Sequence, residues 1–157
     1  VKRNFSSIKI QAIKWKIQAM KKLSKKELKN LVYQVNGAAI EVHKALGPGL
    51  LESVYHQCLL KELELRNIKY ISENPVPIEY KGYNLETKLR CDFLIEDVLV
   101  VELKSVFEVN SIFEAQILTY MNLLKVPIGL LINFNVKNIF YDGQQTFVNE
   151  IYKLLPE

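Results

Sequence analysis

Residues 90–106 read RCDFLIEDVLVVELKSV, and this stretch determines the predicted fold and the candidate site. Two apolar runs, Cys91–Ile95 and Val98–Val101, have the length and composition of buried β-strands. The acidic pair Glu96-Asp97 lies between them, where a turn is expected. The stretch therefore predicts two adjacent antiparallel strands joined by a short loop.

Charged residues occupy positions where a buried strand would normally carry Val or Leu. Asp92 lies inside the first run, and Glu102 and Lys104 continue the second. Because side chains alternate along a strand, Glu102 and Lys104 point to the same side. Buried charges are costly unless they pair or bind a metal, and oxygen ligands of this kind suit Mg²⁺ beside phosphate groups. These three residues alone leave two interpretations open, a structural ion pair or a metal site for phosphodiester hydrolysis.

The length of the predicted loop decides whether the two acids can meet. Residues directly opposite each other in an antiparallel pair share one face of the sheet. A two-residue turn would pair Asp92 with Val101 and direct it away from Glu102. A three-residue loop over Glu96–Val98, or a bulge, would pair Asp92 with Glu102. The metal interpretation therefore predicts the longer loop.

Length and composition predict one globular domain. The 157 residues are 49% hydrophobic and 24% charged, and we expect a single domain over residues 24–157. No apolar stretch approaches the roughly 20 residues that span a bilayer, and the N-terminus lacks the apolar core of a signal peptide. The two cysteines, Cys58 and Cys91, are far apart, which disfavours a zinc site or a disulfide framework and favours the cytoplasm.

The net charge of +4 is unevenly distributed. Residues 1–30 hold ten Lys and Arg with one acid, whereas residues 31–157 hold eleven with sixteen acids. The acidic body weakens the case for tight metal-independent binding of nucleic acid, but it does not weaken a metal site. Residues 1–23 form a basic extension with apolar residues at helical spacing. They fit either an amphipathic helix at a membrane or nucleic-acid surface or a dispensable, poorly packed extension, and we expect the latter.

Two helices are predicted first. Ser24 and Glu27 form a capping box that begins a helix ending near Leu46, before Gly47-Pro48-Gly49. A second helix is predicted from about Leu51 to Arg66. The hydrophobic period then changes to two, which predicts strands at Lys69–Ser72, Val76–Tyr80, Leu85–Ile95 and Val98–Ser105.

The C-terminal half predicts a parallel pair of strands. Asn110 or Ser111 caps a helix through about Leu124, and a buried strand follows at Pro127–Phe134. Shorter strands are predicted at Val136–Tyr141 and Thr146–Val148. The order α-α-β-β-β-α-β predicts an α/β domain with a central mixed sheet flanked by helices. The crossing helix implies that the strands before and after it are parallel.

Further polar side chains lie on the predicted helices. Glu52, Tyr55 and His56 share one face of the second helix, and Gln116 and Tyr120 are four apart on the third. Most helix glutamates are solvated and a buried tyrosine must bond its hydroxyl. The residues alone therefore favour a core role for Tyr55 and a structural role for His56, which stands in no metal-ligand pattern.

Gly49-x-x-Glu52-x-x-Tyr55 resembles the signature of the bacterial GxxExxY proteins. The flanking sequences NGAAIEVHKALGPGLLESVY, PVPIEYKG, EAQILTY and GLLINFN resemble that family throughout, over about residues 28–142. The resemblance implies membership of the PD-(D/E)XK nuclease superfamily and its restriction-endonuclease-like fold.

The resemblance also implies site residues. Asp92 matches the first acid of the motif, and Glu102-x-Lys104 matches (D/E)xK, although Cys91 stands where the superfamily name has Pro. Gln116-x-x-x-Tyr120 is similar to the QxxxY motif of RecB-type nucleases. Glu52 matches the acid that exonuclease-like members supply from an early helix.

From these residues we predict a Mg²⁺ site, in which Mn²⁺ can substitute. Asp92, Glu102 and the Leu103 carbonyl would bind the ion, and Glu52 would reach it directly or through water. Lys104 would orient or deprotonate the attacking water. Further roles are expected for Gln116, which would position water or phosphate, and for the accessory residues Tyr55, Tyr120 and His56.

The predicted activity is metal-dependent hydrolysis of phosphodiester bonds in DNA, with RNA open as an alternative. The competing hypothesis is a catalytically silent nuclease-fold module that binds nucleic acid or a protein partner. A homo-oligomer or an accessory protein is a further expected partner. The sequence carries no recognisable motif for base readout, so it does not define the strand form or sequence that is cut.

Overall fold

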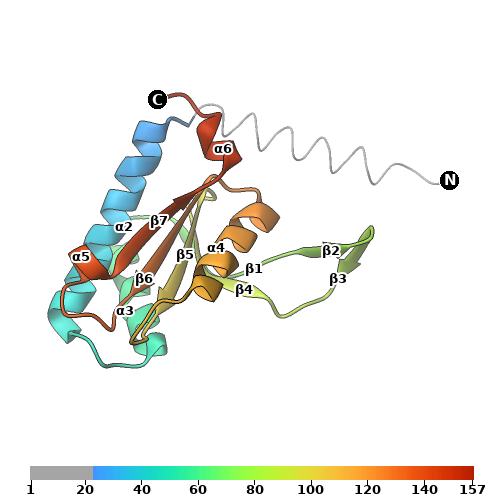
Figure 1. Cartoon of the computed structure of the whole chain (residues 1–157). Helices are drawn as coiled ribbons and strands as arrows, with labels where there is room; N and C mark the ends of the chain where they lie inside the picture. The colour runs from blue at the N-terminus through green and yellow to red at the C-terminus, as the bar shows by residue number, and fades with distance from the viewer. Residues whose placement is uncertain (1–22) are drawn as a thin grey trace.

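The computed structural model describes residues 23–157, and Figure 1 shows their arrangement. The predicted basic amphipathic pattern of residues 1–22 lies outside the described residues. The helices are α2 (Lys25–Leu46), α3 (Glu52–Leu65), α4 (Ser111–Leu124), α5 (Ile139–Asp142) and α6 (Glu150–Lys153). The strands are β1 (Tyr70–Pro75), β2 (Ile78–Tyr80), β3 (Tyr83–Leu85), β4 (Arg90–Ile95), β5 (Leu99–Lys104), β6 (Ile128–Asn133) and β7 (Gln144–Val148).

Local side-chain bonds define where the helices begin. Ser24 Oγ accepts a hydrogen bond from Glu27 N at 3.2 Å, and Ser24 N donates to Glu27 Oε2 at 2.7 Å, which confirms the predicted capping box of α2. Asn110 caps α4, because its side chain accepts from Ile112 N at 3.0 Å. The polar caps satisfy backbone N–H groups that no helical carbonyl can reach.

Five strands form the central sheet in the order β1-β4-β5-β6-β7. The β5–β6 pair is parallel and the other three pairs are antiparallel, so the sheet is mixed, as predicted. Helix α4 connects β5 to β6, which confirms the predicted crossing helix. The fold is a mixed α/β architecture consistent with the restriction-endonuclease-like class.

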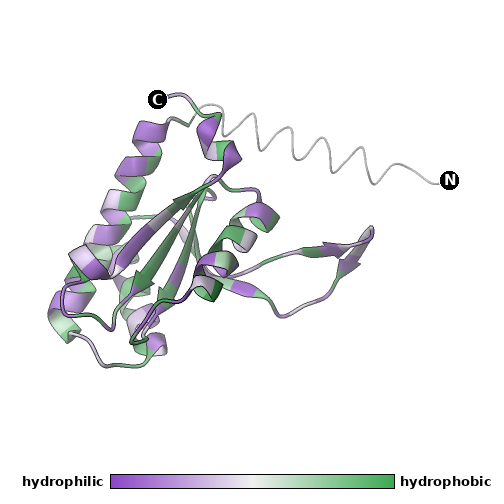
Figure 2. Ribbon diagram, in the orientation of Figure 1, coloured by the Kyte–Doolittle hydropathy of each residue, from purple (hydrophilic) through white to green (hydrophobic). Residues whose placement is uncertain are grey.

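Helices cover both faces of the sheet (Figure 1). On one face, side chains of α2 and α3 pack with Phe93, Val101 and Leu130 in the larger hydrophobic core. On the other face, α4 packs against Val100 and Leu131. Figure 2 shows the central strands as mainly hydrophobic, whereas the helices carry polar residues on their outer surfaces. The two-sided burial explains why β6 is buried at every position.

The loop between β4 and β5 has the predicted length. Ile95 pairs with Leu99 and Phe93 pairs with Val101, so the loop is Glu96–Val98. Its register brings Asp92 opposite Glu102, which confirms the three-residue loop that the metal interpretation requires.

A hairpin arm (residues 76–89) replaces part of two predicted strands. The predicted strand Leu85–Ile95 is wrong as one element, because β3 ends at Leu85 and β4 begins only at Arg90. Glu86–Lys88 are exposed and polar, so no buried face extends the strand across them. Strands β2 and β3 form a separate two-stranded sheet that projects from the body (Figure 1).

The C-terminal region also differs from the prediction. The predicted strand Val136–Tyr141 is wrong, because Ile139–Asp142 form helix α5. Asn138 Oδ1 accepts hydrogen bonds from Phe140 N and Tyr141 N, and this cap makes a helical turn more favourable than a strand. Helix α6 follows a similar cap at Asn149 and was not predicted. No helix among residues 23–157 is long and apolar enough to cross a membrane.

Candidate active site

Asp92 and Glu102 meet through reciprocal hydrogen bonds to the backbone. Asp92 N donates to Glu102 Oε1 at 3.1 Å, and Leu103 N donates to Asp92 Oδ2 at 2.7 Å. Each carboxylate is therefore fixed by the strand that carries the other acid. The β4–β5 pairing thus holds both acids side by side before any ligand binds.

The second oxygen of each carboxylate faces a cationic or ionisable group. Asp92 Oδ1 lies 3.9 Å from His56 Nδ1, and Glu102 Oε2 lies 3.8 Å from Lys104 Nζ. Both distances exceed hydrogen-bond length. Glu102 is only 4% exposed, so its carboxylate is largely removed from water. Carboxylate oxygens of this kind have the chemistry of Mg²⁺ ligands.

Burial makes ionisation of the acids unfavourable. Burial, the largest cause, and the neighbouring Asp92 carboxylate together raise the pKa of Glu102 to about 8. Burial also raises the pKa of Asp92. The hydrogen bond from Leu103 N and the charges of His56 and Lys104 lower it in part. The two acids share a small volume in which a divalent cation would offset their charge.

A cavity of about 270 Å³ lies beside Asp92. Its lining comes from α3, β1 and β4: Glu52, Ser53, His56, Gln57, Ser72, Glu73 and Asp92. At about 30 Å³ per water molecule, it has room for a hydrated ion with a phosphate group. Burial is also the largest cause that raises the pKa of Glu52, followed by the opposing effects of Lys104 and Asp92. The predicted helix acid and the strand acids therefore occupy one electrostatic site.

His56 is held firmly at the wall of this cavity. Its Nε2 lies 2.8 Å from Ser72 Oγ, and its ring stacks on Phe93 with centroids 4.4 Å apart. Tyr70 in turn packs edge-on against Phe93 at 5.9 Å. The ring therefore has a fixed orientation beside Asp92, although the sequence alone favoured a purely structural role.

Lys104 lies at the end of β5 between an aromatic ring and an acid. Its Nζ is 4.9 Å from the centroid of Phe113, and the same ammonium faces Glu102. Its strand partner on β6 is Asn133, whose amide bonds the backbone of Val106 and so fixes the chain after β5. Sequence analysis did not identify Phe113 or Asn133, because their proximity depends on packing across α4 and β6.

Tyr55 lies in the larger hydrophobic core. It is fully buried and stacks on Phe134 at 4.4 Å, and its hydroxyl donates to Gly47 O at 2.5 Å and accepts from Leu50 N at 3.2 Å. This geometry agrees with the core role that the sequence favoured. Through these bonds Tyr55 fixes the turn that precedes Glu52.

Gln116 and Tyr120 meet on α4, as their spacing predicted. Gln116 Nε2 donates to the Tyr120 hydroxyl at 3.0 Å. Burial raises the pKa of Tyr120, and the nearby Glu102 carboxylate raises it further. The pair therefore lies near Glu102, on the face of the sheet that α4 covers, opposite the larger core.

Glu73 is a candidate that sequence analysis missed. It lines the cavity and its charge acts on Asp92. The β1–β4 register brings it level with Asp92, and its φ of 50° departs from the usual strand conformation. Only the register of β1 could have identified it, and the predicted strand ended one residue earlier, at Ser72.

The residues present fit a hydrated oxygen-ligated cation. Within residues 23–157, no group of three His, Cys, Asp or Glu side chains is already arranged to hold a metal. Mg²⁺ does not need such a cage, because it keeps several waters and takes one or two carboxylates. Leu103 N–H points to Asp92 on β4. The carbonyl of Leu103 points to the same side of β5, because the N–H and C=O of one strand residue share a direction, and it is a further candidate oxygen ligand.

A family model described as the PD-(D/E)XK nuclease superfamily matches residues 29–145. The chain belongs to this superfamily. The matched range contains both strands with acids, the helix that bears Glu52 and the helix that bears Gln116. No curated protein and no solved structure gives a significant match. Superfamily membership indicates a nuclease with a nucleic-acid substrate, and these nucleases generally use divalent metal ions.

Proposed function

We propose that this protein is a Mg²⁺-dependent nuclease that hydrolyses phosphodiester bonds of DNA. The observation that carries the proposal is the contact between Asp92 and Glu102, two largely buried acids held by each other's strand beside Lys104. A silent module would gain little from these charges, because the desolvation of buried charges costs stability that pairing only partly restores. The finer assignment to the GxxExxY group, and a location in the cytoplasm, are part of the same proposal.

Asp92, Glu102 and the Leu103 carbonyl would hold the ion, and Glu52 would reach it directly or through water. When bound, the cation supplies charge stabilisation at the phosphate and an acidified water. The chain contributes orientation: the backbone bonds of the two acids fix their oxygens, and the Phe113 ring limits the path of Lys104.

Lys104 would hold or receive the proton of the attacking water at Nζ and stabilise negative charge on the phosphate oxygens. Its location 3.8 Å from Glu102 Oε2 places it beside the proposed ion. Gln116 would position water or phosphate from α4. His56, whose ring faces Asp92 and lines the cavity, would have an accessory role.

Cleavage assays test this proposal directly. Labelled linear DNA, in single- and double-stranded form, and RNA would be incubated with wild type in Mg²⁺, Mn²⁺ or EDTA. We expect cleavage with either metal, none in EDTA, and a loss of at least about a hundredfold in Lys104→Met. Lys137→Met, at an exposed position outside the site, is the matched control. Wild-type protein that is folded and metal-loaded but cuts none of these substrates would refute the proposal.

A further inference from the structure

The hairpin arm has one apolar face that is largely exposed in the part of the chain that the structure describes. Tyr80 pairs with Tyr83 and Ile78 pairs with Leu85, so these four side chains share one face. Tyr80 is 61% exposed, Tyr83 72% and Leu85 47%. The opposite face carries the polar pair of β2 and β3, so the arm is amphipathic although it projects into solvent.

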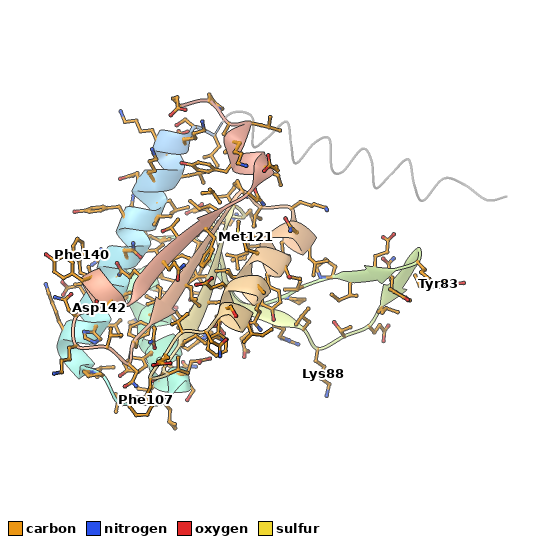
Figure 3. The ribbon with its side chains drawn as sticks, in the orientation of Figure 1. Tyr83, Lys88, Phe107, Met121, Phe140 and Asp142 are labelled. Carbon is orange, nitrogen blue, oxygen red and sulfur yellow. The ribbon has the colours of Figure 1, made fainter. Side chains whose placement is uncertain are left out.

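An isolated hairpin of this size gains little stability from its own contacts. Each strand has three residues, and a two-stranded sheet without a packed face is marginal in water. Figure 3 shows Tyr83 at the outer end of the arm with its side chain directed away from the body. Exposed aromatic rings on a projecting ribbon are typical of a surface that contacts another molecule.

The arm begins next to the candidate active site. The β1–β4 ladder ends at the pair Pro75–Arg90, and Asp92 lies two residues further along β4. The arm is therefore continuous with the strands that line the cavity. From Pro75 to Lys81 it extends by about 20 Å, at about 3.3 Å per strand residue. At about 3.4 Å per nucleotide, the rise of one strand with stacked bases, this length corresponds to roughly six nucleotides.

The side chains around the tyrosines favour a nucleic-acid strand as the occupant. Lys81 Nζ lies 5.4 Å from the centroid of the Tyr80 ring, and Lys88 and Arg90 are exposed along the return segment. Residues 76–90 carry three cations and two acids, Glu79 and Glu86. A ring beside a cation, as at Tyr80 and Lys81, suits a base and its phosphate. The apolar face favours unpaired bases over a duplex, because a ring can stack only on an open base face and the faces of paired bases are covered by their neighbours in the duplex.

We propose that the arm is a stacking platform for a single-stranded segment of the substrate, which it guides toward Asp92. The inference rests on the proposed nuclease function and deepens it, because it specifies the strand form that enters the site. Tyr80 and Tyr83 contact bases, while Lys81, Lys88 and Arg90 contact phosphates.

Fluorescence anisotropy tests the platform without cleavage. Wild type in EDTA would be titrated into labelled dT24, dT6 and a 24-base-pair duplex. We expect single strands to bind more tightly than the duplex, and dT6 to retain most of the affinity. In Tyr80→Ala/Tyr83→Ala, single-strand affinity should fall by roughly 10- to 100-fold, since each base stacked on a ring contributes to binding.

Two matched variants separate stacking from other effects. Tyr80→Phe/Tyr83→Phe keeps the rings and should bind as wild type does. Tyr33→Ala removes a tyrosine that is 77% exposed on α2, far along the chain from the arm, and should also bind normally. Because the arm lies outside the core, the double alanine variant should melt within a few degrees of wild type. Unchanged single-strand affinity in that variant would overturn the platform.

The remaining outcomes also decide the question. A wild-type dimer that becomes a monomer in the double alanine variant, with no loss of single-strand binding, would identify the arm as a protein contact and overturn the inference. Arm-dependent binding without metal-dependent cleavage would uphold the platform while refuting the proposed nuclease. If wild type and the Tyr80→Ala/Tyr83→Ala variant cleave single strands at equal, Asp92-dependent rates, the platform is refuted and the proposed nuclease is upheld.

Discussion

The hairpin arm continues from β1 and β4, beside the candidate active site, yet the side chains of the two regions break opposite rules. At the site, Glu102 is a charged residue that is only 4% exposed, whereas in the arm Tyr83 is an aromatic residue that is 72% exposed. Acids are normally solvated and large rings normally buried. Each region therefore gives up some stability, and a buried charge close to an exposed aromatic surface is what the proposed cleavage and binding require.

The two regions should therefore respond differently to substitution. The site is rigid, because its acids are fixed by strand backbone and its helices pack on both faces of the sheet. The arm is supported mainly by its own short pairing. Changes at the site should affect chemistry and metal binding, and changes in the sheet core should affect stability. Changes in the arm should affect the binding and cleavage of single strands but neither metal binding nor stability.

The largest expected effect is on chemistry, in Asp92→Asn. This change keeps the size of the side chain but removes the charge that would hold the cation. We expect cleavage to fall by roughly a thousandfold or more, as measured by initial rates on labelled DNA in Mg²⁺. Asp142→Asn, on exposed helix α5, is the control and should cleave as wild type does. Equal rates in the two variants would remove the acid pair from the mechanism.

Core truncation should give the next largest effect. Leu130 on β6 is fully buried, so Leu130→Ala should cost about 2–5 kcal/mol of unfolding free energy in urea denaturation. Leu85→Ala in the arm removes a side chain that is 47% exposed and should cost less than about 0.5 kcal/mol. A large loss in the Leu85 variant would mean that the arm packs on the body.

The buried acid predicts an unusual dependence of stability on pH. Burial raises the pKa of folded Glu102 from 4.5 to about 8, so the folded state binds this proton more tightly than the unfolded state. Its stabilising contribution is therefore complete below about pH 4.5 and is lost as the pH rises through about 8. Metal-free wild type should lose a few kcal/mol over this range relative to Glu102→Gln.

Denaturation curves at pH 5 and pH 8.5 would measure this difference in EDTA. Glu102→Gln should match wild type at the lower pH and exceed it in stability at the higher pH. Added Mn²⁺ should restore the stability of wild type at pH 8.5 but not change the variant to the same extent. If the unfolding free energies of the two proteins changed with pH in the same way, Glu102 would not be the group that causes the pH dependence.

The smallest expected effect concerns Tyr55, which supports the turn before Glu52. Tyr55→Phe removes a hydroxyl that bonds both Gly47 O and Leu50 N, while the stacking on Phe134 remains. We expect a loss of about 1–2 kcal/mol in stability and little change in cleavage rate. A large fall in cleavage with unchanged stability would place the hydroxyl in the reaction instead.

Most of the sheet and the acid pair could be predicted from sequence because their signals are local. The apolar runs around Asp92 and Glu102 predicted the two strands, and the capping box at Ser24 predicted where α2 begins. The three-residue loop followed from the requirement that the two acids share one face. The arm was partly missed, because Glu86–Lys88 separate two strands that a continuous pattern had joined.

Other features depend on contacts between segments far apart in the chain. Glu73 reaches the cavity only through the register of β1 on β4, and Phe113 reaches Lys104 only through the packing of α4. The helix at Ile139–Asp142 was missed because an asparagine cap outweighed the apolar alternation that predicted a strand. Such features need the assembled fold before they can be recognised.

Calorimetric titration of Mn²⁺ and Mg²⁺ into metal-free protein tests the central claim most directly. We expect wild type and Asp142→Asn to bind the ions with equal affinity. Asp92→Asn should lose at least about tenfold in affinity, while circular dichroism shows that its fold is kept. Folded wild type that binds neither ion, or an Asp92→Asn variant that binds as wild type does, would contradict the account and leave Asp92, Glu102 and Lys104 as an ion-pair cluster.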